Sequence, residues 1–161
     1  MKKLLLLVLA LMMVMPMAIA DEADTFATAS VADYYAASGL AGDALMDAVN
    51  SQSGCYLVST TNPDGTPNTA YFIFAIKKLD DKYYLQLGLA ENQSKANLNA
   101  NGNGLAVYAA NPEADAKPYA VAGARIYFEA IEDQSIVDTL NAEAARPGAL
   151  FFEIVEVKPL G

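Results

Sequence analysis

The spacing of hydrophobic and polar residues changes several times in the first half of the chain, and each change marks a predicted element. Apolar residues recur at helical spacing over residues 40–49, which predicts an amphipathic helix. Residues 55–60 are rich in β-forming residue types and end at a Pro-Asp-Gly turn within residues 62–67. Further strands are predicted over residues 69–79 and 82–88. The pattern therefore predicts one helix followed by a three-stranded meander.

The second half of the chain alternates between helical and extended patterns. The polar segment that precedes Gly102 and Gly104 predicts a short helix that one of these glycines ends. Asp133 stands before an apolar-periodic segment and can cap its helix. The predicted elements are a helix over residues 91–101, strands over 105–109 and 119–131 (with a bend at Gly123), a helix over 134–145 and a last strand over 149–157. Six largely antiparallel strands with N-terminal, middle and C-terminal helices indicate an α+β domain built on a small barrel.

The N-terminus has the pattern of a signal peptide, over residues 1–20. Lys2 and Lys3 precede an apolar run that Pro16 ends, and Ala18 and Ala20 are the small residues that a signal peptidase reads. We therefore expect an exported protein, periplasmic or extracellular, that has no membrane segment after cleavage. The apolar run is shorter than the roughly 20 residues that span a bilayer, which makes an uncleaved anchor the less favoured alternative.

The rest of the chain divides into two predicted parts. Residues 21–39 are rich in alanine and are predicted to form a flexible or weakly helical arm. Residues 40–161 contain all the predicted strands and form the expected domain. A chain of this length has room for one such domain.

Charge and composition exclude several classes of function. Without Lys2 and Lys3, eight Lys and Arg face nineteen Asp and Glu, a net charge of −11 that argues against nucleic-acid binding. The chain has no His, which excludes imidazole catalysis and His-ligated metals. No metal site is predicted, since the paired acids lie at predicted turns and helix starts. Its one Cys, Cys55, is expected to be a buried strand residue.

Four segments, taken in order, resemble a known family. They are the strand 54–61, the turn 64–69, the helix start 94–101 with its Asn-Leu pair, and residues 122–125. This order is similar to that of the FMN-binding split-barrel family, which includes pyridoxamine 5'-phosphate oxidase-like proteins and small bacterial FMN-binding proteins. The resemblance covers residues 43–132 and implies a split β-barrel, FMN as the cofactor, and a homodimer with the flavin at the subunit interface.

The same resemblance implies a set of cofactor-binding residues. The FMN phosphate would lie at the start of the middle helix, where Gln93 stands in place of the Lys of some relatives and Lys95 and Arg125 are the nearest cations. The flavin ring would lie against the two strands of the hairpin that the Pro-Asp-Gly turn connects. The full set is Val58, Ser59, Thr60, Thr61, Asn68, Thr69, Gln93, Ser94, Lys95, Asn97 and Arg125.

Two functions from different classes follow. The first is an exported flavoprotein, either an electron carrier or a flavin-dependent oxidoreductase of unknown substrate. Pyridoxamine-phosphate oxidase activity itself is not supported, because residues 151–161 lack the family's basic substrate-binding residues. The alternative is a non-enzymatic split-barrel binding module that has lost or changed the flavin. A purely structural or partner-binding role is a third possibility.

Overall fold

The computed structural model describes residues 35–113, 115, 117, 120–144 and 148–161. The predicted signal peptide and the predicted arm up to residue 34 lie outside the described residues. Residues at the end of that arm form a 3-10 helix, η2 (Ala36–Ser38), and Gly39 bridges to Gly123. The described residues all fall within one compact unit, Asp33–Gly161.

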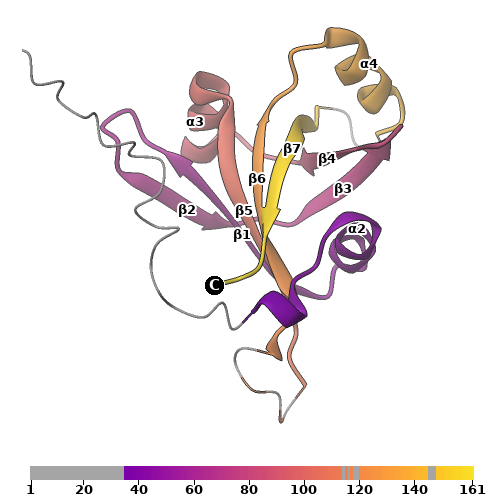
Figure 1. The fold of residues 1–161 in the computed structure, drawn as a ribbon. Coiled ribbons are helices and arrows are strands. Elements are labelled where there is room, and N and C mark those ends of the chain that lie inside the picture. Colours follow the sequence, from indigo (N-terminus) through magenta and orange to yellow (C-terminus); the bar gives the residue numbers. More distant parts are fainter. Residues whose placement is uncertain (1–34, 114, 116, 118–119, 145–147) are drawn as a thin grey trace, which may run out of the picture. The chain divides into compact units, whose positions relative to one another are not determined.

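A single antiparallel sheet forms the body of this unit (Figure 1). Its strands are β1 (Gly54–Thr61), β2 (Pro67–Tyr71), β3 (Phe74–Leu79), β4 (Lys82–Leu87), β5 (Asn103–Ala110), β6 (Gly123–Ala130) and β7 (Leu150–Lys158). Their order across the sheet is β2-β1-β5-β6-β7-β4-β3. The α+β class is therefore confirmed, whereas the prediction of six strands is wrong because the described sheet has seven.

The seventh strand arises where the predicted strand 69–79 breaks. Phe72 and Ile73 separate β2 from β3, and the two strands lie at opposite edges of the sheet. β2 pairs with β1, while β3 pairs with β4, so the predicted three-stranded meander is two separate hairpins. Since only two residues join the two edges, the sheet must curl until they meet at this end. In Figure 1 the two hairpins lie on opposite sides of β5, β6 and β7.

The interior of the curled sheet holds the main core. Alternation along β1 points Tyr56 and Val58 inward, and the facing strands contribute Ile126 and Phe128. The helix α2 (Gly42–Asn50) covers this core with Leu45 and Val49. The hydroxyl of Tyr56 donates to the carbonyl of Val49 at 2.7 Å, which satisfies both groups in the core.

A second cluster lies beneath the helix α4 (Gln134–Ala142), which begins at the predicted cap Asp133. Leu140 packs there against Tyr84 and Phe151. The neighbours Leu85 and Phe152 point instead into the main core. β4 and β7 are therefore covered on both faces, which explains why the last strand alternates only loosely in sequence.

Two smaller expectations are corrected. Cys55 is exposed rather than buried, because it shares the outer face of β1 with Ser59. Gly123 is the first residue of β6 rather than a bend within it. The irregularity in this strand lies between Tyr127 and Phe128, where the register with β7 shifts.

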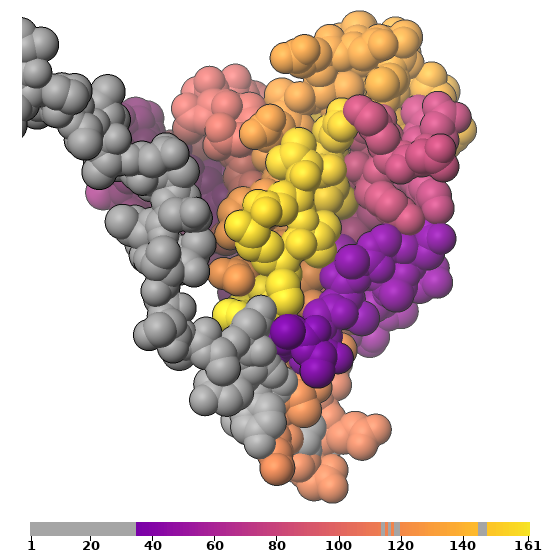
Figure 2. All heavy atoms as spheres, viewed as in Figure 1, coloured from indigo at the N-terminus to yellow at the C-terminus, as the bar shows by residue number. Residues whose placement is uncertain are grey.

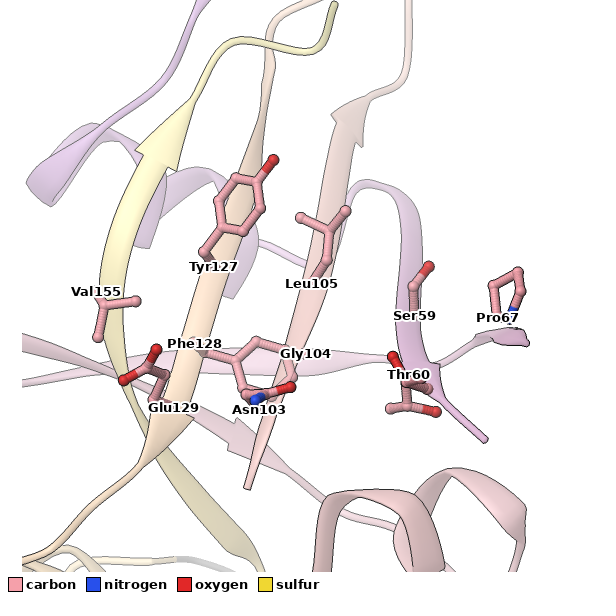
Figure 3. Close-up of a pocket in the computed structure, with 11 residues that line it drawn as sticks. Ser59, Thr60, Pro67, Asn103, Gly104, Leu105, Tyr127, Phe128, Glu129 and Val155 are labelled. Carbon is pink, nitrogen blue, oxygen red and sulfur yellow. The ribbon is translucent and has the colours of Figure 1, made fainter. Parts of the chain in front are cut away.

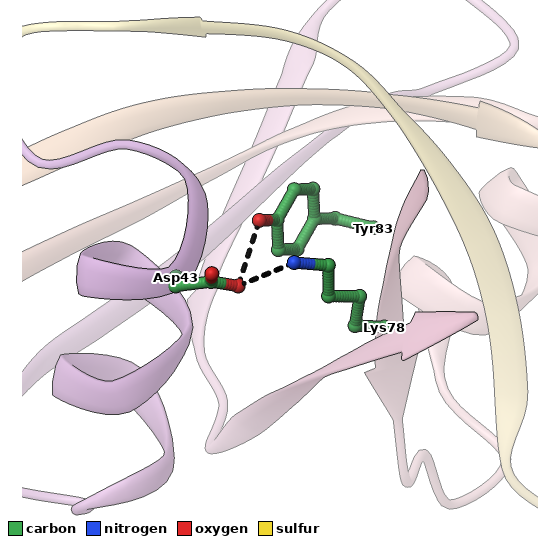
Figure 4. Close-up of polar contacts among 3 residues, drawn as sticks. All are labelled: Asp43, Lys78 and Tyr83. Carbon is green, nitrogen blue, oxygen red and sulfur yellow. Dashed lines mark hydrogen bonds and ion pairs between the residues drawn. The ribbon is translucent and has the colours of Figure 1, made fainter. Parts of the chain in front are cut away.

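An ion pair and a hydrogen bond attach the start of α2 to the β3–β4 hairpin (Figure 4). The Asp43 carboxylate accepts from the Lys78 ammonium at 2.9 Å and from the Tyr83 hydroxyl at 2.8 Å. The ammonium also lies 5.2 Å from the centre of the Tyr83 ring. The space-filling view shows α2, in indigo, against this hairpin, in magenta (Figure 2). These contacts fix α2 over the core.

We expect the contribution of Asp43 to stability to disappear in acid. The bonds from Lys78 and Tyr83 lower the pKa of Asp43 below its ordinary value of 3.8. The stabilisation is therefore complete above that value and is lost as the pH falls through the lowered pKa. The free energies of unfolding of the wild type and of Asp43→Asn, measured in urea, should differ at neutral pH. The difference should shrink as the pH falls below 3.8.

Asp47→Asn, on the same helix, is the matched control, because Asp47 has no ion pair among the described residues. It should unfold like the wild type at neutral pH. A difference between wild type and Asp43→Asn that persisted undiminished in acid would contradict the assignment.

Candidate functional site

Buried polar side chains gather where the helix α3 (Gln93–Asn101) meets the β1–β2 hairpin. Among the described residues, the buried polar ones are Thr60, Ser94 and Asn97, with exposed fractions of 4%, 3% and 2%. α3 begins at Asn92, whose side chain accepts from the N–H of Lys95, and ends at Gly102, whose φ of 69° is left-handed. The predicted helix and its stop at Gly102 are therefore confirmed.

Hydrogen bonds join these side chains into one network. The amide of Asn97 donates to Thr60 Oγ1 at 3.0 Å and to Asn62 Oδ1 at 2.9 Å. The amide of Asn68 donates to the same Thr60 oxygen at 3.1 Å and to Ser94 Oγ at 2.9 Å. Gln93 Nε2 donates to Asn97 Oδ1 at 2.7 Å. We call Thr60, Asn62, Asn68, Gln93, Ser94 and Asn97 the amide cluster.

A tight turn between β1 and β2 positions the hairpin side of the amide cluster. Asp64 accepts from the hydroxyl of Thr66 at 2.6 Å and from its N–H at 3.0 Å, and these bonds lower the pKa of Asp64. Gly65 adopts a φ of 82° within the turn. Asn62 and Asn68 flank the turn, so its geometry places both amides opposite α3.

A groove of about 330 Å³ adjoins the amide cluster and shares Thr60 with it. Figure 3 shows that it crosses the outer face of the sheet, with Ser59, Leu105 and Tyr127 on neighbouring strands. Leu105 and Tyr127 are direct register partners. The groove is lined by Ser59, Thr60, Thr61, Pro67, Asn103, Gly104, Leu105, Tyr127, Phe128, Glu129 and Val155. Its volume lies at the small end of the range for ligand sites.

The structure brings together five of the eleven residues that the sequence singled out. Thr60, Asn68, Gln93, Ser94 and Asn97 all belong to the amide cluster. The cluster therefore gathers the residues expected from two strands and from the helix start.

The outer-face residues form a second group beside the groove. Ser59 and Thr61 line it, and the hydroxyls of Ser59 and Thr69 lie 2.8 Å apart. Val58 differs from them, since its side chain is fully buried in the core and only its backbone could meet a ligand.

The two cations expected near a phosphate are bonded to other groups. The ammonium of Lys95 is bonded to the carboxylate of Glu91, one helical turn away. Arg125 pairs with Val107, whereas α3 adjoins the opposite end of β6, where Gly102 approaches Ala130. The guanidinium of Arg125 donates to the carbonyl of Pro159 at 2.7 Å. Neither cation contacts the amide cluster.

Several residues of the site were not singled out from the sequence. Asn62 accepts from Asn97, although its place before Pro63 suggested only a turn residue. Leu105, Tyr127 and Val155 line the groove from three strands. Their alternation along β5, β6 and β7 indicates the outer face, but only the strand order brings them together.

The described residues contain neither a membrane-spanning helix nor a metal cluster. No helix within the described ranges is long and apolar enough to cross a bilayer. In the same part of the chain, no three Cys, Asp or Glu residues are placed to hold a metal ion together.

Comparisons with solved structures identify the fold. An FMN-binding protein from Syntrophomonas wolfei subsp. wolfei aligns with a TM-score of 0.52 and 17% identity, over 73% of this chain and 84% of that chain. HupZ of Group A Streptococcus aligns with a TM-score of 0.49 and 15% identity, over 75% of this chain and 100% of that chain. A candidate pyridoxamine 5'-phosphate oxidase from Lactobacillus delbrueckii aligns with a TM-score of 0.45 and 20% identity, over 70% and 90%.

The first of these similarities carries the argument on fold. No family model matches the chain, and no curated protein matches its sequence. The similarity to the Syntrophomonas protein covers most of both chains at low identity, so it establishes a shared fold. The fold of the described domain is that of the FMN-binding split-barrel proteins, as the order of its sequence motifs predicted.

Proposed function

We propose that this chain is an exported flavin-binding protein, with FMN as the cofactor that the fold similarity favours. The observation that carries the proposal is the amide cluster, in which three buried polar side chains meet beside an open groove. Buried polar groups are costly to place in a core, so their concentration at one point favours a binding site. The S. wolfei protein of the same fold is described as FMN-binding.

The groups in this region suit the polar parts of a flavin. The pyrimidine edge of an isoalloxazine ring and the hydroxyls of its ribityl chain require both donors and acceptors, which amides and hydroxyls supply. Leu105 and Tyr127 provide apolar surface in the groove. A bound flavin would supply the redox chemistry, while the chain would bind and orient it.

A homodimer belongs to the same proposal. Tyr71, Ile73 and Val155 are exposed by 58%, 54% and 50%, although all three are large and apolar. Val155 lines the groove, and Tyr71 pairs with Leu57 on the outer face of β1. Association of two chains through this face would cover Tyr71 and Val155 and enclose a ligand in the groove.

A second candidate has its own support. Within the described residues, every buried side-chain nitrogen and oxygen already has a hydrogen-bond partner. The amide cluster can therefore hold α3 on the hairpin without any ligand. This observation favours a non-enzymatic binding module that has lost or changed the flavin.

Flavin titration of residues 21–161 tests the proposal. We expect FMN fluorescence to be quenched on binding. We also expect Leu105→Trp, which fills the groove, to weaken binding by about tenfold or more. Val137→Trp on α4 is the matched control, since Val137 is also half-buried but lies outside the groove.

The alternative outcomes separate the two candidates. Equal weakening by both Trp variants would show that the groove is not the site. No binding of any flavin at tens of micromolar would refute the flavoprotein and leave the binding module as the function.

A further inference from the structure

The amide cluster contains no charged side chain. Its six members offer amides and hydroxyls alone, and the adjoining groove is lined by one carboxylate, Glu129, and by no cation. We infer that the flavin site does not recognise a phosphate, so that riboflavin binds at least as tightly as FMN. This inference rests on the proposed flavin site and amends the choice of FMN, because the site would hold a flavin by its ring and ribityl chain without help from the phosphate.

The charges near the site favour a phosphate dianion little, since the one cation beside the groove among the described contacts, Lys158 at 5.3 Å from the centre of the Tyr127 ring, is paired with Glu156. Glu129 lies in the groove and Glu91 stands just before α3. The ammonium of Lys95, the cation within α3, is bonded to Glu91. The net charge of the whole chain is −9, so the long-range field adds to the repulsion.

Some of the hydrogen-bond donors at the start of α3 are already in use, so fewer remain for a phosphate than at an ordinary helix N-terminus. Asn92 already accepts from the N–H of Lys95 at 2.9 Å. The hydroxyl of Ser94 is buried and bonded to Asn68. A phosphate could use the N–H of Lys95 or the hydroxyl of Ser94 only by displacing these bonds, whereas most anion sites on helices use free N–H groups.

A neutral polyol fits the same groups better. Asn62 Oδ1, Asn97 Oδ1 and Thr60 Oγ1 act as acceptors within the amide cluster. A ribityl hydroxyl can donate to such an oxygen and can also accept from a neighbouring amide. A phosphate dianion has no proton to donate, so it could not replace the bonds that these oxygens accept within the amide cluster.

Parallel titrations of residues 21–161 with riboflavin and with FMN test the inference. We expect the Kd of riboflavin to equal or fall below that of FMN. Added salt should improve FMN binding relative to riboflavin, because it screens the repulsion from Glu91 and Glu129. FMN binding about tenfold tighter than riboflavin, and weakened by salt, would overturn the inference while leaving the proposed flavoprotein intact. Failure of both flavins to bind would refute the two together.

A cation introduced into the amide cluster should enable the site to bind the FMN phosphate. Gln93 is exposed, and Gln93→Lys keeps a donor for Asn97 while adding a positive charge. We expect this variant to bind FMN about tenfold more tightly, with riboflavin changed by less than about threefold. Gln93→Met is the matched control, because it has similar length without the charge.

Lys95→Gln tests whether Lys95 breaks its bond with Glu91 and binds the phosphate instead. We expect the ratio of the two Kd values to stay within about twofold of the wild type. A loss of FMN affinity alone in this variant would show that Lys95 binds the phosphate and would overturn the inference.

Discussion

Gly123→Ala should lower the free energy of unfolding by about 3 kcal/mol or more, because the position has no room for a methyl group. A Cβ built on Gly123 would lie 2.2 Å from the carbonyl oxygen of Tyr108 and 2.8 Å from Leu160 Cδ1. The first of these is backbone of the neighbouring strand and cannot rotate away. Gly123 also pairs with Ala109 and bridges to Gly39, so three segments would have to separate.

Chemical denaturation of Gly123→Ala tests this prediction, with Gly88→Ala as the matched control. A Cβ on Gly88 would have no heavy atom within 4 Å, and its φ is not left-handed. We expect Gly88→Ala to change stability by less than about 0.5 kcal/mol. A loss below about 1 kcal/mol in Gly123→Ala would mean that β5 and β6 separate easily at this end, contrary to the close approach in the structure.

Asn97→Ala should destabilise the protein by about 3 kcal/mol, since it removes three hydrogen bonds from a buried position. Asn62 would lose a donor, and Gln93 would lose its acceptor. Thr60 would keep only its bonds with Asn68. The same change should abolish flavin binding at micromolar concentrations, because, of the bonds among the described residues, only Asn68–Ser94 and Asn101–Thr61 would still join the hairpin to the helix.

Asn99→Ala provides the control for this effect. Asn99 lies two residues further along α3, is exposed, and does not belong to the amide cluster. Its replacement should alter stability by less than about 0.5 kcal/mol and leave flavin affinity unchanged. A variant Asn97→Ala as stable as Asn99→Ala would show that the amide cluster contributes nothing to the fold.

Local patterns predicted the elements well, and the errors come from long-range pairing. The helix that Asp133 caps and the helix that Gly102 ends are both present. The break at Phe72 and Ile73 was missed because both residues are apolar and continue the strand pattern. Only the pairing of β3 with β4, at the far edge of the sheet, requires the break.

In the candidate site, too, local patterns predicted some residues correctly, whereas long-range pairing decided the position of others. The Asn-Leu pair of α3 and the hairpin turn correctly indicated that Thr60, Asn68 and Asn97 lie close together. Arg125 could not be placed, because its distance from α3 follows from the register of β6 against β5. Cys55 was expected inside, but a strand pattern alone does not say which of its two faces meets solvent.

The position of the last strand has a consequence for how the chain folds. In the sheet of the described residues β7 lies between β6 and β4, so the two halves of that sheet pair through residues 150–158. The sheet therefore cannot close before residues 150–158 have been synthesised and are free to pair, and its completion requires contacts distant in sequence, which fold slowly. A chain that crosses a membrane before folding, as the proposed export requires, would benefit from this delay.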